Sequence, residues 1–167
     1  MKKRIFTLLL AALCVIMCIS MVACGSDDEN DDKKGEKGVS FEDIVENMEK
    51  VCTAEDDIEY MVGGEDDNCE DLLYECYYGI EEVFEGSINK ALYCENEGEG
   101  DWWTIVVFEC GSEKEAKALE ELTKEYCDSD VIQVEKVVGK VLVISWSEEN
   151  PDIADRMLNV ALGNEAY

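Results

Sequence analysis

Two short runs of the chain are apolar on both of the faces that a β-strand presents, and they limit the fold more than any other feature. These runs are Trp102–Glu109 (WWTIVVFE) and Val141–Trp146 (VLVISW). A strand that is apolar on both alternating faces is typical of the centre of a sheet, where both sides are covered. The sequence therefore predicts a sheet with these two runs in its middle.

The residues between the two runs predict a helix and a strand of a different kind. Ser112 and Glu115 form a capping box, and apolar residues then recur at helical spacing to about Tyr126. Residues Val131–Val138 alternate between apolar and polar side chains, as a strand with one solvated face does. Gly139 then turns the chain into the second apolar run.

Weaker patterns flank this central part of the sequence. Asn150 and Pro151 begin a last helix, which Gly163 ends. The remaining expectations are a capped helix at Ser40–Cys52, a loop at Thr53–Asp67, a short helix at Asn68–Tyr77 and an extended segment at Ser87–Tyr93.

The order of these elements predicts a topology. A right-handed crossover through the helix at residues 112–126 places the two apolar runs next to each other and parallel. The alternating strand Val131–Val138 then lies at one edge of the sheet and the segment Ser87–Tyr93 at the other. We expect an α+β fold: a ferredoxin-like antiparallel or mixed sheet of about four strands with helices on one face, plus two N-terminal helices.

The N-terminus has the pattern of a lipoprotein signal peptide. A basic segment, Lys2–Arg4, precedes an apolar run, Ile5–Val22, and small Ala23 then stands directly before Cys24. In such a signal the cysteine receives a diacylglyceryl group, and cleavage makes it the new N-terminus, anchored by two acyl chains. The alternative is an uncleaved membrane helix, which the length of the run also permits. Both place the rest of the chain outside the cytoplasmic membrane.

The segment after Cys24 predicts a tether. Gly25–Gly38 (GSDDENDDKKGEKG) contains no apolar residue and cannot offset its ordering entropy by burial, so we expect it to be disordered. The expected organisation is a signal peptide at 1–23, the lipidated cysteine and acidic linker at 24–38, a single α+β domain at 39–163 and a tail at 164–167.

Charge and composition exclude several functions. The first 23 residues hold three of the 14 basic residues and none of the 41 acidic ones, so their removal shifts the net charge from −27 to −30. A surface with this much negative charge repels phosphate backbones, so we expect no nucleic-acid partner. The chain has no histidine, which excludes Ser-His-Asp and Cys-His couples and histidine-ligated zinc.

One family resemblance follows from these features. The lipoprotein start, the step Tyr77-Tyr78-Gly79-Ile80 after a short helix, and the order strand, helix, hairpin, helix resemble the small secreted Firmicute lipoproteins grouped as domain of unknown function 4358. The resemblance covers roughly residues 68–163. It implies an exported lipoprotein with one α+β domain, and it assigns no activity and no functional residues.

Six cysteines remain after the signal peptide and the lipidation site: Cys52, Cys69, Cys76, Cys94, Cys110 and Cys127. An even number in an exported domain favours up to three disulfides, and the alternative is buried thiols that pack as small apolar groups. No C-x-x-C pair is present, which argues against a thioredoxin-type redox site or a thiolate metal site.

Strand and helix geometry suggests one pairing. A helix at 112–126 returns the chain to the end of the sheet where the run at Trp102 begins, so Cys127 and Cys94 are expected within bridging distance. Cys52 would then pair with Cys69 or Cys76.

The candidate functions come from different classes. We expect a lipid-anchored, non-catalytic module that binds an unknown envelope protein or wall component, without a cofactor. The alternatives are a hydrolase of wall or glycan with a carboxylate pair, and a weak calcium module at Glu95–Asp101. Trp102, Trp103 and Trp146 favour core packing over a sugar platform because they lie in the most apolar strands.

Overall fold

The computed structural model describes residues 38–53, 58–64, 69–96, 102–127, 130–148 and 150–167. All of them belong to one unit of the chain, Gly35–Tyr167. The elements in chain order are α1 (Phe41–Cys52), β1 (Ile58–Gly63), α2 (Cys69–Cys76), the 3-10 helix η2 (Ile80–Glu82), β2 (Ile88–Asn96), β3 (Trp103–Cys110), α3 (Glu113–Tyr126), β4 (Ile132–Val138), β5 (Val141–Ser147) and α4 (Pro151–Ala161). Within these ranges no helix is both long and apolar enough to span a membrane.

The five strands form one antiparallel sheet in the order β1-β2-β3-β5-β4. Every residue of β3 is buried, and so is every residue of β5 except Trp146. The two apolar runs of the sequence are therefore adjacent inner strands, as predicted, and β4 lies at an edge, as its alternating pattern predicted. The fold class is α+β.

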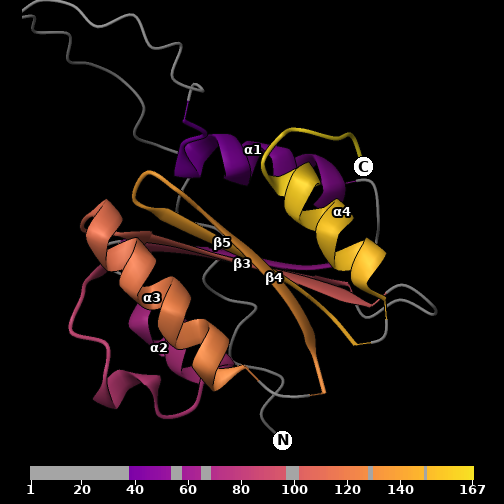
Figure 1. Cartoon of the computed structure of the whole chain (residues 1–167). Coiled ribbons are helices and arrows are strands. Elements are labelled where there is room, and N and C mark those ends of the chain that lie inside the picture. Colours follow the sequence, from indigo (N-terminus) through magenta and orange to yellow (C-terminus); the bar gives the residue numbers. More distant parts are fainter. Residues whose placement is uncertain (1–37, 54–57, 65–68, 97–101, 128–129, 149) are drawn as a thin grey trace, which may run out of the picture. The chain divides into compact units, whose positions relative to one another are not determined.

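Helices cover both faces of the sheet (Figure 1). On one face, which we call the α1/α4 face, Met48 of α1 and Val160 of α4 pack in a single apolar cluster with Leu92 of the sheet. On the other, the α2/α3 face, Leu73 of α2 and Leu119 of α3 pack in a second cluster. The prediction of helices on one face only, as in a ferredoxin-like layer, was wrong.

The direction of one strand also differs from the prediction. We expected β3 and β5 to be parallel, but they pair antiparallel. Helix α3 connects β3 to β4, and these two strands run in the same direction because each is antiparallel to β5. The turn at Gly139 reverses the chain, so β5 lies between them in the opposite direction, as in a split β-α-β unit.

The sheet gains a strand where a loop was expected. Strand β1 lies within Thr53–Asp67 and pairs with β2, so β2 is an inner strand and not an edge strand. The sequence of β1, IEYMVG, is short, half-exposed and acidic on both sides along the chain, and these features weaken its alternating signal. The expected sheet of about four strands therefore has five.

Caps define the helix ends, as the sequence predicted. Ser40 accepts a hydrogen bond from the backbone N–H of Asp43, whose carboxylate in turn accepts from the N–H of Ser40 at 3.0 Å. Asn150 caps α4 with Pro151 at its first position, and Gly163 follows α4 at a φ of +72°, which a side chain would strain. The cap at Ser40 fixes where α1 begins, and hence where its last residue, Cys52, meets the sheet.

Candidate functional site

Cys52 lies in the last turn of α1, at the end of the helix that faces the strand pair β1 and β2. Thr53 closes this turn, because its hydroxyl donates to the backbone carbonyl oxygens of Glu49 at 3.0 Å and Lys50 at 3.1 Å. These contacts satisfy carbonyl groups that a helix end otherwise leaves without partners. The position of the half-buried Cys52 is therefore set by a helix end that is held by a side chain.

Cys94 lies on β2 and is fully buried on the α1/α4 face. Its direct neighbours across the sheet are Tyr60 of β1 and Ile105 of β3. Because side chains alternate along a strand, Leu92 shares this face with Cys94, whereas Ala91 points to the opposite face. This alternation determines which helix Cys94 can meet.

The two sulfur atoms meet between α1 and β2. The Sγ atoms of Cys52 and Cys94 are 3.1 Å apart. This contact lowers the pKa of the Cys52 thiol from its ordinary value, against the opposing effect of burial. The same contact, together with burial, raises the pKa of the Cys94 thiol. Of the two, Cys52 is thus the thiol that ionises more readily.

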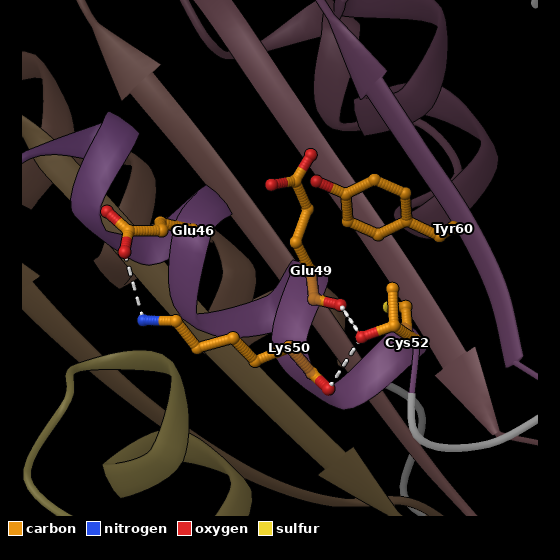
Figure 2. Close-up of a pocket in the computed structure, with 6 residues that line it drawn as sticks. Glu46, Glu49, Lys50, Cys52 and Tyr60 are labelled. Atoms are coloured by element: carbon orange, nitrogen blue, oxygen red, sulfur yellow. Dashed lines mark hydrogen bonds and ion pairs between the residues drawn. The ribbon is translucent and has the colours of Figure 1, made fainter.

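A pocket of about 570 Å³ is lined in part by Cys52 (Figure 2). Its lining residues are Glu46, Glu49, Lys50, Cys52, Thr53 and Tyr60. Glu46 forms an ion pair with Lys50 at 3.0 Å on the pocket wall. The pocket therefore gives small molecules access to one sulfur of the pair, past two carboxylates and one ammonium group.

Tyr60 forms the other side of this pocket. Its hydroxyl is buried and has no hydrogen-bond partner among the residues that the structure describes. Burial, and then the negative charge of Glu49, raise the pKa of this phenol, so it keeps its proton at neutral pH. A buried, protonated hydroxyl without a described partner therefore lies in the wall of the pocket that Cys52 also lines.

The remaining cysteines lie elsewhere. Cys69 and Cys110 are buried in the cluster of the α2/α3 face, and Cys76 packs against it. Burial raises the pKa of Cys76 and of Cys110 to about 12. No disulfide joins the six cysteines within the described ranges.

The expected pairing of Cys94 with Cys127 is not what the structure brings together. Cys127 directly follows α3, which covers the α2/α3 face, whereas Cys94 points to the α1/α4 face. Cys52, for which Cys69 or Cys76 was the expected partner, contacts Cys94 instead.

Other predicted site residues have separate outcomes. Cys24 and the linker lie outside the described residues, as do residues 97–101 of the suggested calcium loop. Glu95, which begins that loop, accepts hydrogen bonds from Tyr93, from Trp102 at 3.2 Å and from Thr104 at 3.5 Å. The described part of the chain contains no group of three or more acidic or cysteine side chains arranged to hold a metal ion.

A polar network on the α2/α3 face was not predicted. The side-chain oxygen of Gln133 accepts from the Tyr77 hydroxyl at 2.8 Å and from the Trp146 indole nitrogen at 2.9 Å. Its amide nitrogen donates to Glu135 at 3.2 Å, and Glu135 also pairs with Lys124 at 3.3 Å. This network joins Tyr77, which directly follows α2, to α3, β4 and β5. Its one sequence signal was a pair of polar residues, Gln133 and Glu135, on the same face of the edge strand β4.

Comparison with models of protein families, with curated proteins and with solved structures finds no match to this chain.

Proposed function

We propose that this chain is an exported lipoprotein, held on the outer face of the cytoplasmic membrane by a diacylglyceryl group on Cys24. Its α+β domain is a non-catalytic binding module of the cell envelope. The observation that carries the proposal is the N-terminal order: basic Lys2–Arg4, the apolar run Ile5–Val22, then Ala23 and Cys24. The resemblance to the lipoproteins of domain of unknown function 4358 favours the same location.

The charge of the domain favours a cationic partner. The mature chain carries a net charge of −30, and α1 alone exposes four acidic side chains but one basic one, Lys50. A surface of this kind attracts cations over about one Debye length, roughly 8–10 Å at physiological salt. The acidic tether at Gly25–Gly38 would hold the domain away from an anionic membrane surface. An envelope protein or wall component with a basic surface fits these properties.

The anchor is tested by Cys24→Ala in the full chain. We expect loss of lipoprotein processing and release or mislocalisation of the protein, measured by gel mobility and by partition into detergent. Cys18→Ala is the matched control, because Cys18 lies in the same apolar run but follows bulky Met17, so it should change neither measurement. Unchanged membrane retention and mobility of the Cys24→Ala variant would mean a spanning helix instead.

The partner class is tested with the full chain in detergent micelles. We expect an oligolysine peptide to bind with an affinity that falls steeply as NaCl rises, because screening weakens the attraction. A neutral wall glycan is the control and should not bind. Release of soluble reducing sugar from that glycan would contradict the non-catalytic function and support a hydrolase.

A further inference from the structure

The contact between Cys52 and Cys94 is close to that of a disulfide. A disulfide has an S–S distance of about 2.03–2.05 Å, so the two Sγ atoms, now 3.1 Å apart, need to approach by only about 1 Å. Both residues are fixed by ordered elements: Cys52 by the capped end of α1 and Cys94 by pairing on both sides of β2. The pair is thus already placed for a bond.

The two cysteines differ in access to solvent. Cys52 lines the pocket, whereas Cys94 is 0% exposed beneath it. An oxidant that enters the pocket therefore reaches Cys52 first. The sulfur–sulfur contact also makes Cys52 the first to react. It lowers the pKa of the Cys52 thiol and raises the pKa of the Cys94 thiol, so Cys52 is the one that becomes a thiolate.

The sheet separates this pair from competing thiols. Cys69 and Cys110 are buried in the cluster on the opposite face, so neither shares the space between α1 and β2. A mixed disulfide at Cys52 has the Cys94 sulfur as its nearest sulfur neighbour in the described structure. This placement favours the Cys52–Cys94 disulfide over a bond to any other cysteine.

We propose that Cys52 and Cys94 form a disulfide by thiol–disulfide exchange, in which Cys52 is the first to react and Cys94 completes the bond. The Cys52 thiolate attacks one sulfur of an external disulfide, R–S–S–R, and forms a mixed disulfide as the first R–S⁻ leaves. Cys94 then attacks the Cys52 sulfur, the Cys52–Cys94 bond forms, and the second R–S⁻ leaves. The two protons lost by the cysteines convert the leaving groups to two R–SH, so the external disulfide is reduced and the cysteine pair is oxidised.

The bond would join the first helix to the sheet. Helix α1 follows the N-terminal segment of the chain, and β2 is an inner strand. A covalent link between them would keep α1 on the sheet when the preceding segment is pulled. This consequence goes beyond the proposed envelope function, and the bond itself is testable in solution whether or not Cys24 carries a lipid.

Peptide mapping of the full chain tests the bond directly. Trypsin is unsuitable because Cys52, Cys69 and Cys76 share one peptide between Lys50 and Lys90. Cleavage after glutamate separates the six cysteines and places Cys52 in residues 50–55 and Cys94 in residues 86–95. We expect the reduced chain, oxidised with cystamine, to give a mass equal to these two peptides joined, which reduction removes.

Single variants test the order of the two steps. Cys94→Ser should accumulate a stable cysteamine adduct on Cys52, because no second thiol is present to displace it. Cys52→Ser should form an adduct on Cys94 about tenfold or more slowly, since Cys94 is fully buried and does not line the pocket through which cystamine arrives. Cys76→Ser is the matched control and should still give the linked peptides. Oxidised glutathione, which is anionic, should react more slowly than cationic cystamine at low salt because Glu46 and Glu49 line the entrance.

Several outcomes would overturn the proposal. One is a map of the oxidised wild-type chain in which Cys94 is joined to Cys127 or Cys110, or in which all six cysteines remain reduced. Another is equal adduct formation by the Cys52→Ser and Cys94→Ser variants. The wild-type map needs no substitution, so a variant that fails to fold does not remove the test.

Discussion

The two faces of the sheet contain the same kinds of side chain, but these side chains differ in their hydrogen-bond partners and in their access to solvent. Each face has a tyrosine and cysteines next to an apolar cluster. On the α2/α3 face the Tyr77 hydroxyl donates to Gln133, and burial keeps the pKa of Cys76 at about 12. On the α1/α4 face the Tyr60 hydroxyl has no described partner, and Cys52 touches Cys94 beside an open pocket.

The two faces contain the same residue types, so residue type alone does not determine which cysteine can react. Solvent access to the thiol and the groups that contact it make the difference. A thiol surrounded by apolar atoms keeps its proton and is inert, whereas one at a pocket wall beside a second sulfur is available for exchange. The α2/α3 face thus buries its thiols and gives the Tyr77 hydroxyl and the Trp146 indole an acceptor. The end of the α1/α4 face near β1 holds the cysteine pair for which thiol–disulfide exchange is proposed.

The largest expected effect tests whether the two faces fold together. Met48→Ala on the α1/α4 face and Leu119→Ala on the α2/α3 face each remove a fully buried side chain, so each should lower the free energy of unfolding by about 2–5 kcal/mol. Chemical denaturation followed by circular dichroism measures this. Val62→Ala, at a side chain that is 42% exposed, is the control and should change stability by about 0.5 kcal/mol or less. Two separate transitions in either core variant would show that the faces unfold independently.

The next effect concerns the proposed disulfide. Cys52 and Cys94 are 42 residues apart in sequence, so a bond between them should stabilise the domain by about 4 kcal/mol through the unfolded chain. The measurement compares denaturation midpoints of the oxidised and the reduced wild-type protein. A double Cys52→Ser, Cys94→Ser variant should not respond to reductant. A response as large as that of the wild type would assign the stabilising bond to other cysteines.

A smaller effect is expected at the polar network of the other face. Gln133→Leu leaves both the Tyr77 hydroxyl and the Trp146 indole without their acceptor, and should cost about 1–3 kcal/mol of unfolding free energy. Tyr77→Phe removes one donor and leaves the Trp146 bond, so it should cost about 0.5–1.5 kcal/mol. A double-mutant cycle of the two substitutions gives their coupling. Purely additive effects would mean that Tyr77 and Gln133 do not share a bond in solution.

Local signals in the sequence predicted much of this fold. The caps at Ser40, Ser112 and Asn150 are where side-chain chemistry required them, because capping depends on residues two or three positions apart. The strands β3 and β5 were recognised because burial on both faces leaves an unbroken apolar run.

Structural features that depend on contacts between distant parts of the chain could not be predicted from local patterns in the same way. Which face Cys94 occupies relative to α3 depends on the register of β2 against β3, and no local pattern in the sequence gives that register. The site was missed for this reason and because β1, which brings Tyr60 next to Cys94, is short and half-exposed. Once β1 is recognised, alternation along β2 places Cys94 opposite Tyr60 and away from α3.

The smallest expected effect is the loss of stability over one unit of alkaline pH, from pH 9 to 10, at the thiol of Cys76. Burial, and then the charges of Glu75 and Glu95, raise its pKa from the ordinary 9.0 to about 12. Between pH 9 and 12 the unfolded chain has lost this proton and the folded domain still holds it. The thiol's contribution to stability is therefore complete below pH 9 and falls by about 1.4 kcal/mol for each pH unit above it.

Cys76→Ser does not titrate in this range, so its unfolding free energy should fall less steeply than that of the wild type. Denaturant midpoints at several pH values measure the difference, in which the other ionising groups cancel, and parallel curves would mean that water reaches Cys76 in the folded domain.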